Sequence, residues 1–444
     1  MTDITRPNVH PSTPTPSQRS VLMFALQFPP FSQSTGRLRT LSFVRHLPAH
    51  GWTPLVVTAR AEVYPETDPA TLKDIPAQAH VVRAWGLDIA RAVSIRGVYP
   101  RWLATPDRWA PWIAGAAWAG WATAKRHRPH AIWATFPIPS ALLAALLLHK
   151  VSGIPLIADL RDPLVYESWP VHRWDRHVYR WLERKVVRAA SAVVVTTPGA
   201  AAMYRSRYPE YDSGKFHVIA NGIEDASPDS VPEPSVDDAS KTITLVHSGV
   251  MEMPDRSPLA FFDALRLMRE RGQLPKRALR IVLRGAGSEE SYAEAARMRG
   301  VDSIVQLLPH VSRGQAMKEV AAASALLLFQ GPECNRQIPA KAYEYLASGK
   351  PIIGLMHPDG DTHALVQGGW GVPYAADMNS PQHISSMLTR FFSDLEQDCA
   401  YVPPASLHVQ YMRRTRASEL ARLLDTITER VPLQRLDAVE LKNE

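Results

Sequence analysis

The sequence predicts an α/β protein built from two doubly wound domains that follow one another along the chain. Short apolar runs alternate with helical stretches over most of the 444 residues, which is the pattern of parallel strands connected by helices. The alternation is interrupted once, by an acidic, proline-containing segment at residues 224–240. A chain of this length has room for two domains, each with its own hydrophobic core.

The first predicted domain covers residues 21–222. Its opening strand is the apolar run Val21–Gln27, which is ended by two successive prolines. A helix is expected around Leu38–His50, and Gly51 is expected to stop it. Further strands of this domain are expected at His80–Arg83, Pro155–Asp159, Ala192–Thr197, Phe216–Ala220 and Thr53–Thr58.

Residues 131–148 form an uncharged stretch that is long enough to resemble a membrane span. Pro137 and Pro139 divide the stretch into AIWATF and SALLAALLL. Because proline interrupts a helix but is accepted in its first turn, we expect a strand at Ala131–Phe136, a loop and a buried helix, rather than a span.

Residues 223–241 are predicted to be a linker, because the segment from 224 to 240 holds six acidic residues, three prolines and no basic residue. The second domain is expected at residues 242–403. Its predicted strands are Thr242–Ser248, Leu279–Arg284, Ile304–Leu307, Ala325–Gln330 and Pro351–Leu355. Its predicted helices are Pro258–Arg271, Glu289–Arg299, Arg313–Ala323 and Ala340–Ser348. Two such domains are expected to face each other across a cleft, with ligands at the carboxyl ends of the strands.

The two ends of the chain are expected to lie outside these domains. Residues 1–20 contain four prolines and no apolar central stretch, which predicts a disordered tail rather than a secretory signal. Residues 404–444 are expected to form a C-terminal helix and tail, in which the charged helix Leu407–Val431 packs on either domain.

Charge is unevenly distributed between the two halves. Residues 1–222 carry 26 Lys and Arg against 14 Asp and Glu, whereas residues 223–444 carry 24 against 29, which gives +12 and −5. A basic half indicates an anionic partner (nucleic acid, an acidic membrane or a phosphorylated ligand) or simply an arginine-rich solvated surface. The two cysteines, Cys334 and Cys399, exclude a disulfide framework and a Cys-based zinc site, and they fit a reducing cytosol.

Two segments of the second half are candidate phosphate sites. Arg284-Gly285-Ala286-Gly287 ends a strand and precedes a helix, where glycine lets a phosphate approach unpaired N–H groups; an ordinary strand-to-helix turn would look the same. In the second segment, IPAKAYEYLASGKPIIG, Lys341 and Glu344 lie three residues apart on one helix face. Lys341 suits a phosphate and Glu344 suits ribose hydroxyls, whereas the alternative is a surface salt bridge.

The phrase PAKAYEYLASGKPII resembles the donor-site helix of family 4 glycosyltransferases, retaining enzymes of the GT-B fold. Further segments resemble that family in the same order, over about residues 21–355. They are FPPFSQSTGRLRTLSFVRHLPAHGWTPLVVTA, IPLIADLRDPL, VIANGIE, LVHSGVMEMPDRSP and LPHVSRGQAMKEVAAASALLL. The resemblance implies a GT-B fold with two Rossmann-like domains, a nucleotide-sugar donor held mainly by the second domain, and an acceptor held by the first. It implies no metal and no cofactor.

Site residues follow from the resemblance, position by position. Glu344 would hold the ribose, and Gly36 would let its loop approach the donor phosphates. His310 would lie near the nucleobase, and Asp162, the one expected catalytic residue, would lie with Arg161 near the transferred sugar. The diphosphate would be neutralised by Arg256, Arg284 and Lys341, with Gly285 beside them.

The sequence departs from the family pattern at two places. Relatives often carry a second glutamate before the donor-site glutamate, but Arg336 stands eight positions before Glu344. Relatives also often carry a lysine five positions after the phosphate-site arginine, but Phe261 stands five positions after Arg256. The sugar of the donor is therefore left open, and Arg284 is expected to replace the missing lysine.

Residues 82–129 carry eight Lys and Arg against two Asp, together with several tryptophans that suit an anionic membrane interface. These tryptophans are Trp85, Trp102, Trp109, Trp112, Trp118 and Trp121. Those from 109 to 121 fall at roughly 0, 300, 180 and 120 degrees around a helix, so core packing of some of them is an equal alternative.

We therefore expect a metal-independent glycosyltransferase of the hexosyltransferase type that builds a surface polysaccharide from a nucleotide-sugar and a glycan or lipid-linked acceptor. It is expected to be cytoplasmic, at the inner face of the cell membrane. A GT-B-fold sugar-nucleotide epimerase and a catalytically idle nucleotide-binding scaffold are the alternatives. Nucleic acid is not expected as a partner, because the basic residues form no known binding module.

Overall fold

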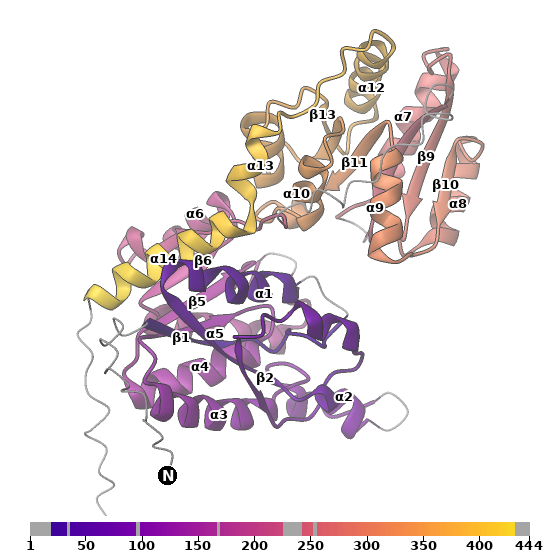
Figure 1. Ribbon diagram of the computed structural model, residues 1–444. Coiled ribbons are helices and arrows are strands. Elements are labelled where there is room, and N and C mark those ends of the chain that lie inside the picture. Colours follow the sequence, from indigo (N-terminus) through magenta and orange to yellow (C-terminus); the bar gives the residue numbers. More distant parts are fainter. Residues whose placement is uncertain are drawn as a thin grey trace, which may run out of the picture. The chain divides into compact units, whose positions relative to one another are not determined.

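The computed structural model describes residues 19–32, 36–94, 98–166, 169–224, 242–251 and 255–430. The predicted linker core, most of the predicted N-terminal tail and the last 14 residues lie outside the described residues. Figure 1 labels the helices and strands in chain order.

The first sheet has seven strands in the order β3-β2-β1-β4-β5-β6-β7. Its central strand β1 pairs in parallel with both β2 and β4, and every residue of β4 is buried. The strands are β1 (Arg19–Phe24), β2 (Trp52–Ala59), β3 (His80–Ala84), β4 (Ala131–Thr135), β5 (Leu156–Arg161), β6 (Ala192–Val195) and β7 (Phe216–Val218). Its helices are α1 (Gly36–His46), α2 (Ile89–Ala92), α3 (Trp112–His127), α4 (Pro139–Ser152), α5 (Arg173–Ala189) and α6 (Pro198–Arg207). The order outward from β1 in both directions is that of a Rossmann-like sheet.

The second sheet has six strands and repeats the same plan, in the order β10-β9-β8-β11-β12-β13. Here β8 is central and pairs in parallel with β9 and β11. The strands are β8 (Thr242–Ser248), β9 (Ala278–Arg284), β10 (Val305–Leu308), β11 (Ala325–Gln330), β12 (Ile352–Met356) and β13 (Ala375–Asp377). Its helices are α7 (Leu259–Glu270), α8 (Glu289–Met298), α9 (Arg313–Ala322), α10 (Ala340–Ala347), α11 (Asp361–His363) and α12 (Pro381–Glu396).

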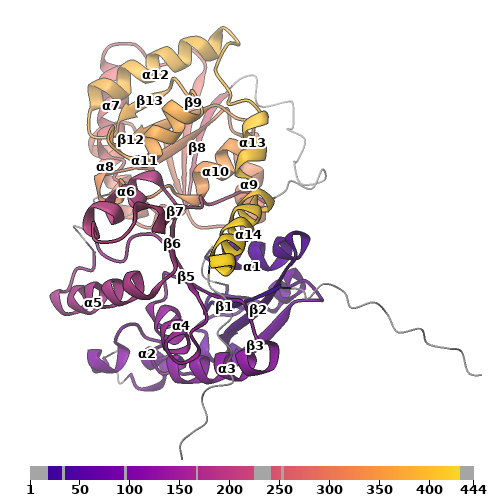
Figure 2. The ribbon, with the colours of Figure 1, turned by 90° about the vertical axis from the view of Figure 1, so that its left-hand side faces the viewer.

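The helices of the second sheet lie on both of its faces, because the parallel strands are connected by crossovers on either side of β8. Helices α7 and α12 pack against each other on one face, and α10 and α9 lie on the other, as Figure 2 shows. The two-domain α/β fold predicted from the sequence is therefore confirmed. The uncharged stretch from 131 to 148 forms β4, a turn and most of α4, as predicted, and no helix within the described ranges is long and apolar enough to cross a bilayer.

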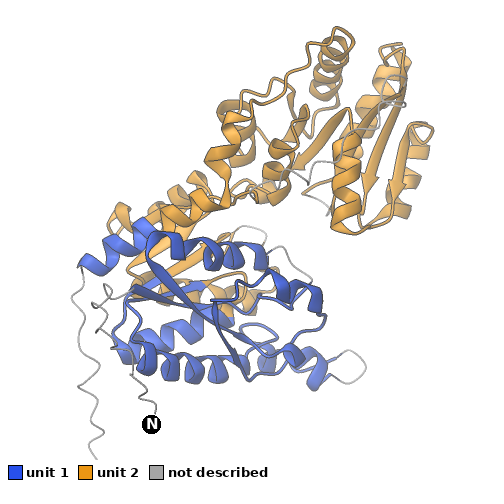
Figure 3. Cartoon of the chain, viewed as in Figure 1, with its two compact units in different colours: residues 1–134, 140–157, 421–444 blue, residues 135–139, 158–420 orange. Residues whose placement is uncertain are grey.

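The chain divides into two compact units, which Figure 3 colours separately. Unit one comprises residues 1–134, 140–157 and 421–444, and unit two comprises residues 135–139 and 158–420. Strands β1 to β3 belong to unit one, whereas β6, β7 and the whole second sheet belong to unit two.

The C-terminal segment forms two helices where the sequence predicts one. Helix α13 (Ser406–Tyr411) ends at Met412, whose extended backbone forms a β-bridge with Ile223, and α14 (Arg413–Arg430) follows. The end of α14 belongs to unit one, where Asp425 pairs with Arg19 at 2.8 Å and accepts a hydrogen bond from Trp52 at 2.8 Å. The segment that the sequence left open to either domain therefore contacts both: Tyr411 of α13 packs on Tyr343 and Trp370 of the second domain, and the end of α14 lies in unit one.

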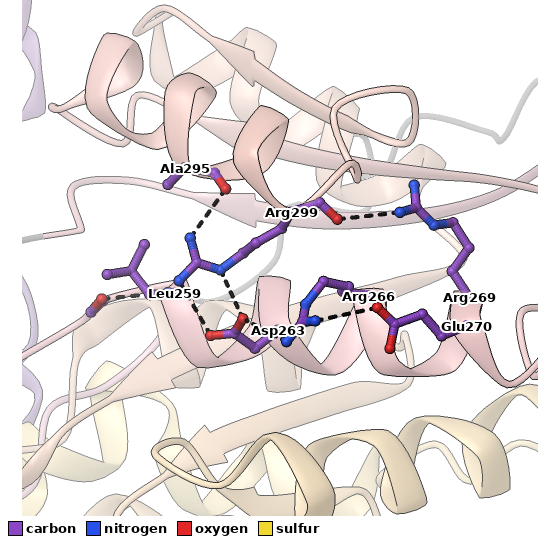
Figure 4. A network of polar contacts seen from close by, with 8 residues as sticks. Leu259, Asp263, Arg266, Arg269, Glu270, Ala295 and Arg299 are labelled. Atoms are coloured by element: carbon purple, nitrogen blue, oxygen red, sulfur yellow. Dashed lines mark hydrogen bonds and ion pairs between the residues drawn. The ribbon is translucent and has the colours of Figure 1, made fainter.

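Many arginines of the second domain have structural partners. Arg299, at the end of α8, donates to the Asp263 carboxylate on α7 at 2.9 Å and to the Ala295 carbonyl at 3.2 Å (Figure 4). Arg269 of α7 donates to the Arg299 carbonyl, and Arg266 pairs with Glu270 one turn further along. These contacts join α7 to α8 at the side of the sheet.

Candidate functional site

The strand order of the second sheet reverses between β8 and β11, because the chain builds outward from β8 to β10 and then returns to β11. The carboxyl ends of the two strands diverge at such a point, and the crevice outside them is where doubly wound sheets bind ligands. Two predicted residues, Lys341 and Glu344, lie on α10, the helix that follows β11. The predicted donor-binding helix is therefore placed at the switch point of its sheet.

Lys341 is directed at His247, a residue that sequence reasoning missed. The Nζ atom of Lys341 lies 3.1 Å from Nε2 of His247, near the end of β8. The other ring nitrogen, Nδ1, lies 2.8 Å from the carbonyl of Leu327 on β11. A neutral imidazole with Nδ1–H donating to the Leu327 carbonyl leaves Nε2 to accept from the lysine. The Gly249 carbonyl also lies 3.1 Å from Nε2 and is not paired with the ring in this tautomer. His247 thereby links the two strands at the switch point to the lysine.

Lys341, His247 and Arg256 form what we call the Lys341 cluster. When no anion is present, its electrostatics favour the neutral forms of the Lys341 amine and the His247 imidazole. Burial, and then the Arg256 charge, lower the pKa of Lys341 to about 7, although the Glu344 carboxylate acts in the opposite direction. Burial and the Lys341 charge lower the pKa of His247 well below its usual value. A neighbouring positive charge thus lowers the pKa of Lys341, and a bound diphosphate would offset this effect.

Arg256 is the second cation of the cluster. Its Nε donates to the Oε1 of Gln330, the last residue of β11, at 3.3 Å, and lies 3.6 Å from Asp255. Neighbouring contacts fix this loop: Asp255 accepts from the Cys334 backbone N–H at 3.1 Å. Arg256 is therefore held at the end of β11, and its charge acts on Lys341.

The loop after β8 passes close to Lys341 because it contains Gly249. This glycine has a φ of +115°, and a Cβ atom there would lie 2.9 Å from the Nζ of Lys341. The Ser248 N–H donates to the Tyr345 hydroxyl of α10 at 3.0 Å, which ties the same loop to α10. Gly249 thus permits an approach of backbone to lysine that a side chain would block.

Glu344 lies one turn beyond Lys341 and is paired with Arg313, at the start of α9, at 2.9 Å. The Glu344 side chain is 32% exposed, so its carboxylate is accessible to a ligand as well as to the arginine. Both readings drawn from the sequence, a ribose acceptor and a surface ion pair, therefore have a physical basis, although the partner is Arg313 rather than Lys341.

Arg284 has a different environment from the other two predicted cations. It ends β9 and donates to both carboxylate oxygens of Glu319 on α9, at 2.9 and 2.5 Å. A third hydrogen bond, at 2.9 Å, runs to the Pro309 carbonyl. The structure therefore gives this guanidinium a local structural role and does not bring it to Lys341.

Gly285 and His310, which the sequence assigns to the phosphates and to the nucleobase, lie next to each other at neighbouring strand ends. Gly285 has a φ of +63°, and its N–H donates to the Leu308 carbonyl at 2.7 Å. A Cβ atom at Gly285 would lie 3.4 to 3.5 Å from atoms of His310. The Gly249 N–H donates to the Arg284 carbonyl at 2.8 Å, which joins this pair to the Lys341 cluster.

Asp162 follows β5, and its neighbour Arg161 holds a left-handed backbone with a φ of +54°. The Arg161 carbonyl accepts from both the N–H and the hydroxyl of Thr196, which fixes this strained turn. Burial raises the pKa of Tyr166 and that of Cys334 to about 12, and the nearby Asp162 carboxylate adds to both increases. Asp162 thus lies near residues of the 332–337 loop within unit two.

Gly36 begins α1 and belongs to unit one, whereas the other predicted site residues belong to unit two. Within the described ranges, no group of three or more His, Cys, Asp or Glu side chains is arranged to hold a metal ion.

Two Rossmann-like sheets of identical strand plan, with a cationic cluster at the switch point of the second, define the GT-B class of fold. Residues 34–222 match the family model described as a glycosyl transferase 4-like domain. The chain therefore contains a glycosyl transferase 4-like domain, and the resemblance to family 4 glycosyltransferases that the sequence indicates is confirmed. No curated protein is significantly similar to the chain in sequence.

Solved structures with the same fold include enzymes of two kinds. Sucrose-phosphate synthase from Thermosynechococcus elongatus aligns with a TM-score of 0.56 at 13% identity, over 93% of this chain and 97% of that chain. HepE of Anabaena, in complex with UDP and glucose, aligns with a TM-score of 0.56 at 15% identity, over 93% and 98%. A putative UDP-N-acetylglucosamine 2-epimerase from Listeria monocytogenes aligns with 0.57 at 11% identity, over 94% and 98%. At these identities the likeness shows the fold alone.

Proposed function

We propose that this protein is a retaining glycosyltransferase that moves a sugar from a nucleotide-sugar to a glycan or lipid-linked acceptor in surface-polysaccharide synthesis. One observation carries the proposal: Lys341 contacts His247 at the switch point of the second sheet, within electrostatic reach of Arg256, with Glu344 on the same helix as Lys341. The glycosyl transferase 4-like domain that precedes this sheet supports the same reading.

Departure of a nucleoside diphosphate places negative charge on the leaving phosphate. Preorganised positive charge at that position lowers the barrier, and Lys341 and Arg256 would supply it. Protonated Lys341 donates hydrogen bonds to the diphosphate, and the His247 imidazole positions the amine from the other side. Glu344 would accept hydrogen bonds from ribose hydroxyls through its two carboxylate oxygens.

Asp162 is proposed as the polar residue beside the transferred sugar. Its fixed position after the strained Arg161 suits a residue that orients a substrate hydroxyl or stabilises positive charge on the sugar ring. The leaving phosphate itself would take the proton of the acceptor, so the proposal requires no general base from the protein. His310 and Gly285 would line the side of the nucleobase, and Gly36 would lie near the donor phosphates.

A thermal-shift screen of UDP, GDP, ADP and their glucose and N-acetylglucosamine derivatives tests the donor site. A ligand that binds only the native state raises Tm in proportion to its affinity. We expect one base to be selected, and we expect Glu344→Ala to abolish sugar transfer from the selected donor. Transfer that survives this substitution would contradict the assignment, and a protein that binds a nucleotide without transfer or hydrolysis would be the idle scaffold.

The finer features of the reaction are testable with the same donor. We propose a hexosyltransferase that needs neither metal nor cofactor and acts at the cytoplasmic face of the cell membrane. Transfer is expected to persist in excess EDTA, and NMR of the product is expected to show the anomeric configuration of the donor. Loss of activity in EDTA that added Mg²⁺ restores would refute the metal-independent reading.

An epimerase is the second candidate, because solved epimerases share this fold over 94–95% of this chain. The two reactions differ in their products. An epimerase would convert UDP-N-acetylglucosamine in the absence of any acceptor, whereas a transferase would leave it intact or slowly hydrolyse it. NMR of the donor incubated with enzyme alone therefore separates the candidates.

Membrane attachment is proposed for the tryptophan-rich segment of unit one. Trp85, Trp102 and Trp118 are 48, 71 and 69% exposed, whereas Trp112 is fully buried and belongs to the core. In unit two, α5 also exposes Trp174 and Trp181. Exposed tryptophans among basic residues suit an anionic bilayer surface. Flotation with vesicles of phosphatidylglycerol and phosphatidylcholine at low salt is expected to carry the protein upward, and recovery in the soluble fraction would refute the attachment.

A further inference from the structure

A pocket of about 770 Å³ lies in unit two, apart from the Lys341 cluster. Its walls come from the segment after β5, from helices α5 and α6, and from the 332–337 loop of the second domain. Small-molecule sites in proteins commonly have volumes of about 300–1,000 Å³. The pocket is therefore of a size that holds a sugar with one or two phosphate groups.

The lining of the pocket is strongly basic. Five arginines contribute to it, against two glutamates: Arg176, Arg180, Arg184, Arg207 and Arg336, with Glu183 and Glu333. The excess of basic over acidic residues in the lining is greater than in the whole chain, which carries 50 Lys and Arg against 43 Asp and Glu.

One glutamate is already neutralised by its neighbours. Glu183 is buried and forms an ion pair with Arg207 at 2.7 Å. The hydroxyls of Tyr204 and Tyr208 each donate to it at 2.9 Å, so its carboxylate is fully engaged. The remaining lining charges are four arginines against Glu333, which leaves a pocket with net positive charge.

Three of these arginines form one row on α5. Arg176, Arg180 and Arg184 are spaced four residues apart, which places them within about 80 degrees of one another around the helix. Among the described residues, the side chains of Arg180 and Arg184 form no ion pair or hydrogen bond, and both are exposed. Like charges in a row on a helix are unfavourable without a counter-charge, so the row costs stability unless an anion occupies the pocket.

The pocket opens beside the expected position of the transferred sugar. Tyr166 lines it and forms a hydrogen bond with Gln337, which also lines it. Asp162 precedes Pro163, another lining residue, and its carboxylate acts on Tyr166. An acceptor held by the arginines would therefore have its sugar end close to Asp162.

We propose that this pocket binds the acceptor, and that the acceptor carries phosphate. The inference rests on the proposed glycosyltransferase function and names the chemical class of its second substrate. Phosphate is preferred to a carboxylate because a phosphate group accepts several charge-assisted hydrogen bonds, and planar guanidinium groups bind it in a bidentate manner. A sugar phosphate and a lipid-linked sugar diphosphate share this chemistry.

Two probe ligands test whether the pocket binds phosphate and distinguish a free sugar phosphate from a lipid-linked diphosphate as the acceptor. Glucose 1-phosphate represents a free sugar phosphate, and farnesyl diphosphate represents a lipid-linked diphosphate. Calorimetric titration of the full chain at low salt is expected to detect at least one of them. Tighter binding of farnesyl diphosphate assigns the acceptor to the lipid-linked class, and tighter binding of glucose 1-phosphate assigns it to free sugar phosphates. Failure of both probes to bind the native protein overturns the proposal.

Matched variants on one helix locate the binding. R180Q/R184Q removes two pocket arginines, whereas K185Q/R188Q removes the same charge from exposed positions of α5 that do not line the pocket. We expect R180Q/R184Q to weaken the Kd about tenfold for each guanidinium removed, and K185Q/R188Q to change it less than about threefold. Equal effects of the two double variants would reduce the interaction to general charge attraction and overturn the proposal.

Two further variants distinguish probe binding in this pocket from probe binding at the proposed donor site. R336Q removes a lining arginine from the second-domain loop and is expected to weaken the same probe, whereas K341Q changes only the donor cluster and is expected to leave it unchanged. Loss of probe binding in K341Q alone would place the phosphate at the donor site and overturn the proposal. Nucleotide binding is measured in parallel: failure of the donor function would appear as no nucleotide binding by the native protein, independently of the R180Q/R184Q result.

Discussion

The Nζ of Lys341 lies 3.1 Å from the Nε2 of His247, so that an amine and an imidazole face each other at the end of β8. Burial and the adjacent Arg256 lower the pKa of Lys341 to about 7, and the distant side of the imidazole is held by the Leu327 carbonyl. In the free protein this cluster therefore holds less positive charge at neutral pH than its residues suggest. Binding of a diphosphate would favour the protonated form of Lys341 and so restore the positive charge of the cluster.

The first prediction is that binding of a nucleoside diphosphate takes up a proton above pH 7. Free Lys341 is largely neutral there because its pKa is about 7, and an anion beside it favours the ammonium form. The affinity is therefore highest below pH 7 and falls as pH rises toward 9, by at most about tenfold per pH unit. Calorimetric titrations at pH 8, in two buffers of different ionisation enthalpy, measure the proton uptake.

The same pKa has a consequence for stability. The unfolded chain keeps Lys341 protonated up to its usual pKa of 10.5, whereas the folded protein releases this proton above about 7. The unfolded state thus holds more protons between these values, so this residue makes the free energy of unfolding rise with pH in that window. Lys341→Met is expected to remove both effects. Binding at pH 8 without proton uptake would contradict the assignment of the amine to the diphosphate.

The second prediction concerns His247 as a positioning residue. His247→Phe preserves the edge-on packing against Phe329, where the ring centroids are 5.2 Å apart, but removes the acceptor for Lys341. We expect the affinity for a nucleoside diphosphate to fall about tenfold, because Lys341 loses the hydrogen bond that positions its amine. The affinity for the matching nucleoside is expected to change little. His383→Phe, at an exposed position on α12, is the control. A similar loss for nucleoside and diphosphate would indicate a general structural effect instead.

The third prediction separates the two roles of Glu344. Both Glu344→Gln and Arg313→Gln break the exposed ion pair at 2.9 Å, and such pairs contribute about 0–1 kcal/mol. Only Glu344→Gln removes the carboxylate proposed to hold the ribose. We expect it to weaken nucleotide-sugar binding about tenfold or more, whereas Arg313→Gln leaves binding unchanged. Equal loss of affinity in the two variants would show that the ion pair, rather than ribose contact, is what matters.

The strands of both sheets could be predicted from the sequence because they are apolar runs of usual length. Strand β11, for example, reads ALLLFQ and is wholly buried. Strand β13 was missed because its three residues, Ala375–Asp377, carry no apolar run. The break at Met412 was also missed, since its cause is a β-bridge to Ile223, almost 190 positions away in the sequence.

The residues of the proposed donor site could be brought together from the sequence only in part, for a physical reason. Lys341 and Glu344 are close in sequence, so helical spacing alone places them on one surface. The contact of Lys341 with His247 depends on the pairing of β8 with β11, which spacing cannot show. Glu319, the partner of Arg284, lies 35 positions away, so sequence reasoning had no means of distinguishing a paired arginine from one available to phosphate. A histidine at the end of a predicted central strand was the one available signal for His247.

The fourth prediction is that Arg284 acts on stability rather than on donor binding. Arg284 and Glu319 are only 12 and 21% exposed, and the pair is doubly hydrogen-bonded. Arg284→Gln is expected to lower the free energy of unfolding by about 1–3 kcal/mol, because it leaves the Glu319 carboxylate without its charged partner. Urea denaturation measures the loss, and nucleotide titration is expected to show an unchanged Kd. A large loss of nucleotide affinity with an unchanged free energy of unfolding would show instead that Arg284 contacts the diphosphate.

The fifth prediction compares two positive-φ glycines with different surroundings. Gly249 and Gly272 both have positive φ values, +115° and +64°, so alanine is strained at either position and is expected to cost about 1–3 kcal/mol of stability. A Cβ atom at Gly272 meets nothing within 4 Å, whereas at Gly249 it lies 2.9 Å from the Nζ of Lys341. Gly249→Ala must therefore displace the amine from the place where the diphosphate is proposed to bind. We expect it to weaken nucleotide binding about tenfold or more, whereas Gly272→Ala lowers stability and leaves the Kd unchanged. Titration of both variants below their unfolding temperatures provides the comparison, and a native Kd in Gly249→Ala would mean that Lys341 does not contact the donor.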